Sequence, residues 1–114
     1  PPSRDILPDN GTSGCIVYDG EMPVVAGFIY RSNSSLAYIS WIVSNFKYKD
    51  KAKRREAIVF LLKELDGYSR SIGAKYCYIN FDNKFLIDVC ESLGFVKGSV
   101  TQEMIKTWDH RQQG

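Results

Sequence analysis

Histidine is almost absent from this sequence of 114 residues: the only one is His110, in the polar segment that ends the chain. A lone histidine in such a segment is typical of a solvated terminus, and it argues against a Ser/His/Asp or Cys/His catalytic pair. Cysteine is also scarce. Cys15, Cys77 and Cys90 are odd in number and form no CxxC or Cys/His pattern, which argues against a disulfide framework or a zinc site and fits a reducing cytoplasm.

Long apolar runs and a large net charge are missing as well. No run reaches the roughly 18 residues of a membrane-spanning helix, and no basic-then-apolar start resembles a signal peptide, so a soluble, cytoplasmic protein is expected. The formal net charge of +2 is too small to attract the whole molecule to nucleic acid or a membrane, so any anion site must come from local clustering. The chain opens with Pro1-Pro2 and no methionine, which predicts a piece of a longer polypeptide.

The apolar content indicates one compact α/β domain. With 44% hydrophobic residues, the chain can build one core but not two. Residues 1–13, rich in turn-forming residues, are predicted to be a leading loop before a domain spanning 14–108, and residues 109–114 a polar tail. Residues 14–18, 24–30 and 37–46 are β-branched and aromatic, and Asp19-Gly20 marks a hairpin turn, so three strands in an antiparallel meander are expected.

A long amphipathic helix and a parallel strand are predicted next. Between residues 58 and 72 the apolar side chains recur three or four apart, the period of a helix that Asp50 can cap and Gly73 can stop. Residues 76–81 are aromatic and β-branched, and predict a strand. The crossover from the third strand to this one should be right-handed, which makes the two strands parallel and the sheet mixed.

A second helix and a closing strand complete the predicted order. Asp82 or Asn83 can cap this helix, and Gly94 is placed to end it. Residues 95–108 predict one or two further strands. Ligands of open α/β sheets bind beyond the carboxyl ends of parallel strands, which here is the segment 43–57.

The clearest charge cluster precedes and begins the long helix. Six of the nine residues from 47 to 55 are lysine or arginine. A helix N-terminus offers partial positive charge and free N–H groups, and the basic side chains add full charges, so a pyrophosphate could bind there. A solvated basic surface and, with Phe46 and Tyr48, a nucleic-acid patch are the alternative interpretations.

The stretch that follows residue 82 resembles a known family pattern. Residues 83–95 read NKFLIDVCESLGF, which is similar to the pattern N-x-x-A-I-x-L-Y-E-K-x-G-F of the GNAT (Gcn5-related N-acetyltransferase) superfamily. Asn83 and Gly94 stand eleven positions apart, as in the family. Three further residues match: Ile87, Glu91 and Phe95. The resemblance covers residues 14–108 and omits the family's first strand and first helices. The sequence looks like the small GNAT-type proteins of bacteriophages.

The resemblance implies transfer of an acetyl group from acetyl-coenzyme A to a primary amine, by direct attack on a thioester held between splayed parallel strands. The cofactor-binding residues that it carries over are Ile42, Val43 and Ser44 along the pantetheine arm, Asn83 on its other side, Arg54, Arg55 and Ala57 at the pyrophosphate, and Lys51 and Lys53 near the outer phosphate. The expected partners are acetyl-coenzyme A, an amine acceptor and, in one interpretation, a second copy of the chain. No metal is expected.

Three departures from the family pattern leave the catalytic role open. Residues 54–59 stand where the family has R/Q-x-x-G-x-G/A, and they contain no glycine to let backbone N–H groups close on phosphate. Cys90 replaces a tyrosine that protonates the leaving thiolate; a thiol could donate that proton, but packing as a small apolar side chain is the alternative. Residues 37–46 contain no carboxylate to act as base. The rival interpretation is a GNAT-shaped protein without chemistry that engages a protein partner.

Overall fold

A computed structural model of the chain describes residues 13–108. The predicted polar tail with His110, and all but the last residue of the predicted leading loop, lie outside the described residues. Within the described range the chain forms four strands and two helices, in the order β-β-β-α-β-α.

The first three strands form the predicted antiparallel meander. They are β1 (Gly14–Asp19), β2 (Met22–Arg31) and β3 (Leu36–Ser44), with β2 in the middle. Gly20, in the turn between β1 and β2, has a φ of 61°, a left-handed conformation that glycine adopts without steric penalty. The hairpin predicted from Asp-Gly is therefore confirmed.

One long helix connects β3 to the fourth strand. This helix, α1 (Lys51–Ser71), is capped by Asp50 as predicted, because the Asp50 side chain accepts a hydrogen bond from the Lys53 N–H at 3.1 Å. The strand β4 (Tyr76–Ile79) then pairs with β3 in parallel. The mixed sheet predicted from the crossover is confirmed, with the strand order β1-β2-β3-β4.

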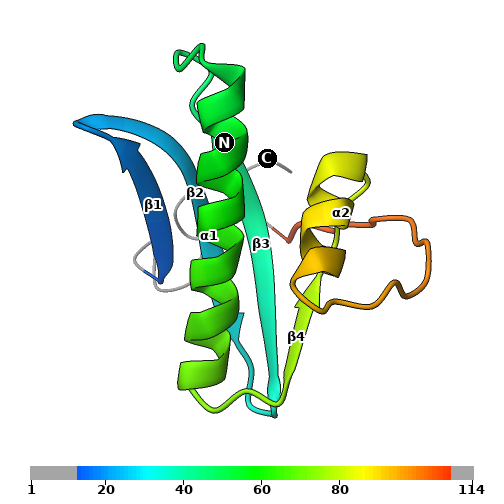
Figure 1. The fold of residues 1–114 in the computed structure, drawn as a ribbon. Coiled ribbons are helices and arrows are strands. Elements are labelled where there is room, and N and C mark those ends of the chain that lie inside the picture. The colour runs from blue at the N-terminus through cyan, green and yellow to red at the C-terminus, as the bar shows by residue number, and fades with distance from the viewer. Residues whose placement is uncertain (1–12, 109–114) are drawn as a thin grey trace.

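The second helix, α2 (Lys84–Ser92), begins at Asn83, whose side chain accepts a hydrogen bond from the Leu86 N–H at 3.2 Å. Figure 1 shows α1 lying across the middle of the sheet and α2 beside β4, so that both helices cover the same face. Neither of these helices, the only two in residues 13–108, is long and apolar enough to cross a membrane.

The core lies between α1 and the helix-covered face of the sheet. Its most deeply buried side chains are Val24, Ile29, Ile39, Leu61, Leu62 and Leu65. Gly27 of β2 lets the layers approach closely, since a Cβ atom there would stand 2.8 Å from Leu65 Cδ1 and 2.7 Å from Ile42 Cδ1. This packing fixes the direction of α1 along the sheet, and its N-terminus lies at the end where β3 finishes (Figure 1).

The strands predicted in residues 95–108 are wrong, since this segment forms no strand. Phe95 packs against the core and its N–H donates to the Cys90 carbonyl at 3.0 Å, but the apolar residues beyond it are exposed. They are Val96, Val100, Met104, Ile105 and Trp108. A strand without an apolar face to bury against has too little stability to form alone. The predicted order therefore ends at α2.

Candidate functional site

The two parallel strands are paired at one end and open at the other. Their register runs from Leu36 opposite Tyr76 to Ile39 opposite Ile79, where β4 ends, whereas β3 continues to Ser44. Figure 1 shows the two strands meeting where both begin and then diverging. We call this divergence of the two backbones the wedge; it runs between residues 40–44 of β3 and the chain that leaves β4 (Figure 1). One edge of β3 therefore keeps backbone N–H and C=O groups without a ladder partner for about 17 Å, five residues at roughly 3.3 Å each.

A β-bulge bends β3 where it leaves β4. In the register with β2, Ser40 pairs with Phe28 and Val43 pairs with Ala26, so that Trp41 and Ile42 both lie opposite Gly27. Trp41 has a φ of 58°, and it is the only non-glycine residue with a positive φ in the described part of the chain. A bulge of this kind bends a strand and increases its twist, which turns β3 away from β4.

The N-terminus of α1 stands at the open end of the wedge and has unused hydrogen-bond donors. The Asp50 carboxylate takes the Lys53 N–H, and the Asp50 carbonyl takes the Arg54 N–H at 3.0 Å. The N–H groups of Lys51 and Ala52 donate to no group within residues 13–108. Free N–H groups and the helix dipole make such a terminus suited to an anion.

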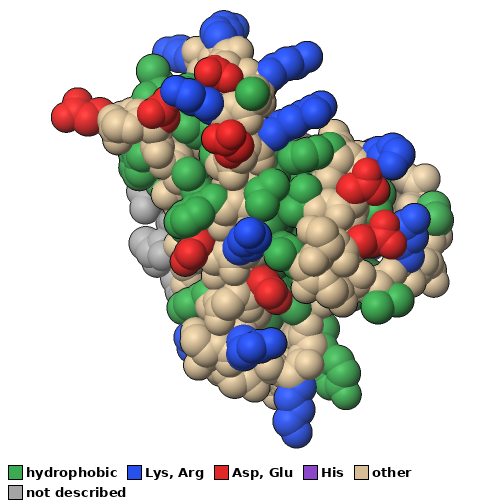
Figure 2. Space-filling model, viewed as in Figure 1, with side chains coloured by type: hydrophobic (Ala, Val, Ile, Leu, Met, Phe, Trp, Pro, Cys, Tyr) green, Lys and Arg blue, Asp and Glu red, His purple; other side chains and the backbone are tan. Residues whose placement is uncertain are grey.

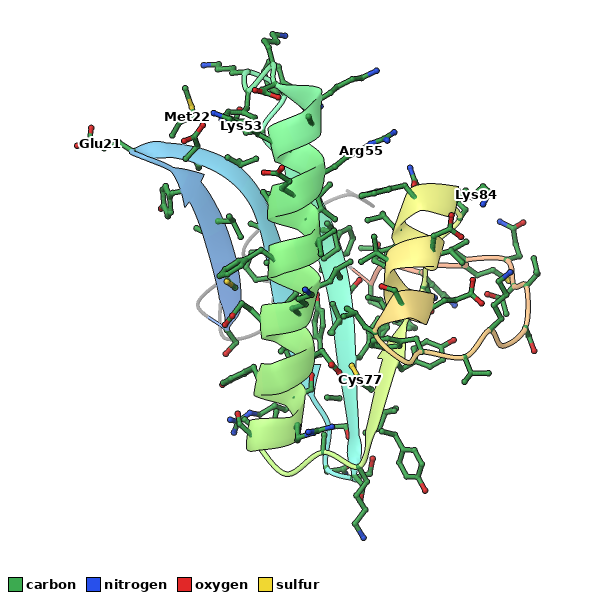
Figure 3. All side chains as sticks on the ribbon, in the orientation of Figure 1. Glu21, Met22, Lys53, Arg55, Cys77 and Lys84 are labelled. Carbon is green, nitrogen blue, oxygen red and sulfur yellow. The ribbon has the colours of Figure 1, made fainter. Side chains whose placement is uncertain are left out.

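Basic side chains surround this terminus. Lys51, Lys53 and Arg55 are exposed, and none of them forms an ion pair within the described residues. The Arg55 guanidinium lies 4.9 Å from the centroid of the Phe85 ring, which brings the first turns of α1 and α2 together. Figure 2 shows lysine and arginine gathered over the N-terminal end of α1, and Figure 3 shows Arg55 directed towards the α2 side.

Arg54 and Ala57 are placed differently from their neighbours. The Arg54 guanidinium donates to the Tyr48 carbonyl, so this half-buried side chain turns back towards the loop before α1. Ala57 is buried in the second turn of the helix. Residues 54–59 thus lie inside α1, where backbone N–H groups are used by the helix's own hydrogen bonds, and the free donors belong to the turn before them.

The loop before α1 is tied to the β1–β2 hairpin by contacts that the sequence did not suggest. The Tyr48 hydroxyl donates to the Asp19 carboxylate at 2.7 Å, and this hydrogen bond, together with burial, raises the pKa of Tyr48 to about 12. Asn45 donates to the Pro23 carbonyl at 2.8 Å and accepts from the Lys47 N–H at 3.0 Å, which ends β3 two residues earlier than predicted. Tyr48 was considered only as a nucleic-acid contact, but its ring is buried.

Asn83 and Cys90 lie on opposite ends of α2. Asn83 stands beside Phe85 at the end near the wedge, where its side-chain carbonyl caps the helix and its amide NH2 has no partner within the described residues. Cys90 is buried in the core, and the raised pKa of its thiol, about 11, is caused mainly by burial and further by Cys77 and Asp66. Since Cys77 pairs with Ala37 at the closed end of the strands, Cys90 is not brought together with the other candidate residues.

A cavity of about 380 Å³ lies away from the wedge, under the ends of α1 and α2. Its lining mixes Asp66 with Arg70 and Lys75, and includes the thiol of Cys77. It contains no helix N-terminus, and an acidic side chain would oppose an anion there. The wedge, and not this cavity, is therefore the candidate site.

Acetyltransferases are among the solved structures that have a similar fold. A Thermus thermophilus protein matches with a TM-score of 0.59 and 14% identity, over 81% of this chain and 68% of its own. A Trypanosoma brucei acetyltransferase matches with a TM-score of 0.54 and 16% identity, over 76% of this chain and 62% of its own. Glucosamine-6-phosphate N-acetyltransferase from Arabidopsis thaliana matches with a TM-score of 0.51 and 15% identity, over 77% of this chain and 59% of its own.

These likenesses concern the fold. No family model and no curated protein matches the sequence. The chain spans between 59% and 68% of the length of the three structures. The mixed sheet of four strands with two helices is the GNAT-like arrangement of these neighbours, as the resemblance implied.

Proposed function

We propose that this domain binds acetyl-coenzyme A in the wedge and transfers the acetyl group to a primary amine. One observation carries the proposal: β3 and β4 pair at one end only, and a basic helix N-terminus stands at the open end. An extended neutral arm with an anionic group at one end would match an unpaired strand edge that leads to a basic helix N-terminus. The acetyltransferase fold of the neighbours supports the same chemistry.

The chemistry of the coenzyme sets its direction in the wedge. Its phosphates are at one end, and its thiol is at the other end of a neutral pantetheine arm. The phosphates belong at the free N–H groups of Lys51 and Ala52, with the side chains of Lys51, Lys53 and Arg55 around them. The thioester then lies deeper, near the last pair of the two strands, Ile39 and Ile79.

Backbone groups would hold the pantetheine arm. The unpaired edge of β3 at Ile42, Val43 and Ser44 can exchange hydrogen bonds with the amides of the arm, as an added strand would. The Asn83 amide NH2 is free to bind it from the other side. Arg54 and Ala57 support this site from behind, one by its bond to the loop and the other by its packing in the core.

The transfer itself needs little from side chains. The amine nitrogen attacks the thioester carbonyl, the N–C bond forms, the C–S bond breaks, and the departing thiolate is protonated while the amine loses a proton. Backbone N–H groups of residues 40–44 can stabilise the oxyanion of the intermediate. Because β3 has no carboxylate, we assign both proton transfers to water, and a Cys90→Ala variant with an unchanged turnover rate would agree with that assignment.

Calorimetric titration with acetyl-coenzyme A tests the binding claim. Saturable heat is expected, with about a tenfold weaker Kd in Arg55→Ala, a loss of about 1.4 kcal/mol. Lys63→Ala is the matched control, since Lys63 is also exposed on α1 but lies two turns further along. No heat at high micromolar ligand would remove the cofactor from the proposal.

A second candidate function is binding without chemistry. The observation that favours it is that residues 54–59 are helical and lack glycine, so no flexible loop closes on the phosphates. Mass spectrometry of amine mixtures incubated with acetyl-coenzyme A separates the candidates. An acetylated amine that forms only with the protein present supports transfer, whereas bound coenzyme without product supports the second candidate.

A further inference from the structure

The face of the sheet opposite the helices carries a group of aromatic side chains beside the wedge. We call it the aromatic cluster: Tyr30, Tyr38, Trp41 and Tyr78. The ring centroids are 5.9 Å apart for Tyr30 and Tyr38, and 5.4 Å apart for Tyr38 and Tyr78. The Trp41 indole N–H donates to the Tyr30 hydroxyl. Three strands thus contribute to one cluster, and Tyr38 and Tyr78 form the pair next to the point where β3 and β4 part.

Trp41 is held in this cluster at a conformational cost. A φ of 58° is unfavourable for any residue with a Cβ atom, and a large side chain gains nothing from it intrinsically. Strained residues persist where the surrounding structure fixes them, and they concentrate at functional sites. The strain lies at the bulge, in the first unpaired residues of β3, which places the indole at the border of the wedge.

The four described strands place no charged side chain on the helix-free face. Because Ala37 and Ile39 point to the core, alternate positions point away from it. These positions on β1 to β4, together with Trp41 at the bulge, include Gly14, Ile16, Tyr18, Ala26, Phe28, Tyr30, Leu36, Tyr38, Ser40, Tyr76 and Tyr78. None is acidic or basic, so the face offers no partner to a phosphate backbone or to a polyamine.

Within residues 13–108, packing closes one side of the sheet to the acceptor of the proposed reaction. Near the last strand pair, the helix side of the sheet is filled by Ile39, exposed to 1%, and by Leu61 of α1, exposed to 0%. An amine must therefore approach from the helix-free face, where the aromatic cluster borders the wedge. Aromatic rings stack on other rings, and an uncharged surface that takes the amine out of water favours its neutral form, whose lone pair attacks.

We infer that the aromatic cluster binds the acceptor, and that the acceptor is a primary amine carried on an aromatic ring. This inference rests on the proposed acetyl transfer. By holding the amine against uncharged rings, the cluster supplies part of what a general base would otherwise supply.

Ligand-observed NMR with phenethylamine as probe tests the inference, with spermidine as the polyamine comparison. Tyr38→Ala and Tyr78→Ala each remove one ring of the pair that neighbouring strands contribute to the cluster, and both residues lie outside the unpaired part of β3. Each variant is expected to weaken phenethylamine binding at least tenfold and to leave the Kd for coenzyme A unchanged. Tyr76→Ala is the matched control, because Tyr76 lies on the same strand and face, two residues further from the wedge, and should bind phenethylamine like the wild type.

Two results would overturn the inference: spermidine binding as tightly as phenethylamine, or an equal loss of phenethylamine binding in Tyr76→Ala. Absence of saturable phenethylamine binding to the wild-type protein would do the same. Failure of the proposed function looks different, since coenzyme A would then give no heat in calorimetry while phenethylamine still distinguishes the variants.

Discussion

The two halves of β3 belong to one strand but lie in opposite surroundings. The first half, Leu36 to Ile39, is paired with a strand on each edge, and Ala37 and Ile39 are each exposed to 1% beneath the helices. The second half, residues 40–44, is paired on one edge only, contains the bulge at Trp41 and is more exposed. One strand therefore serves stability at one end and offers binding groups at the other, and substitutions should separate the two.

The largest expected effect is on stability, and it comes from α1, which packs over the paired half of β3. Leu61→Ala should lower the free energy of unfolding by about 3 to 5 kcal/mol, because it leaves a cavity where a fully buried side chain was. Denaturant unfolding measures it. Phe60→Ala, one residue away and 54% exposed, should cost less than about 1 kcal/mol; equal costs would mean that α1 does not pack as described.

Added side-chain volume opposite the bulge, where the two halves of β3 meet, should lower stability. Gly27→Ala places a methyl group within 2.8 Å of Leu65 and Ile42, opposite the bulge, and should cost about 1 to 3 kcal/mol. Gly67→Ala is the control, because a Cβ there meets no atom within 4 Å, and in a helix alanine should stabilise by up to about 1 kcal/mol. Thermal and denaturant unfolding measure the stability of both variants. A Gly27→Ala variant that is more stable than the wild type would contradict the close packing at Gly27.

A smaller effect on stability is expected from the loop between β3 and α1, and it depends on pH. The hydrogen bond to Asp19 raises the pKa of Tyr48 to about 12 from its ordinary value of 10, so the fold favours the neutral phenol. The stabilisation by this hydroxyl is fully present below pH 10 and is lost between about pH 10 and pH 12. The free energies of unfolding of the wild type and of Tyr48→Phe should differ by a constant amount below pH 10. This difference should shrink between about pH 10 and pH 12. A difference that grows above pH 10 would contradict the Asp19 contact.

Much of the fold could be predicted because local chemistry and tertiary packing agree along most of the chain. Asp50 and Asn83 cap helices where their short polar side chains can accept a backbone N–H. Residues 95–108 contain valine, isoleucine and aromatic side chains, which favour strands, but composition cannot reveal whether a strand has a surface to pair with and bury against. That is why the closing strands were predicted and are not formed.

The site was harder to predict than the fold. The spacing of basic residues and the Asp50 cap located the N-terminus of α1, yet they could not show that the Arg54 side chain turns back to Tyr48. The tie between Tyr48 and Asp19 joins residues 29 positions apart, and neither belongs to a recognisable motif. The bulge at Trp41 depends on the register with β2, which one strand's sequence does not contain.

An NMR titration of the labelled protein with coenzyme A tests the central claim most directly, because amide shifts report where the ligand lies. The largest shifts should fall on residues 40–44 of β3 and on Lys51 and Ala52, with small shifts on the paired half of the strand. Shifts gathered instead around the cavity lined by Ser69, Cys77 and Leu93, with the α1 N-terminus unchanged, would contradict a coenzyme site in the wedge.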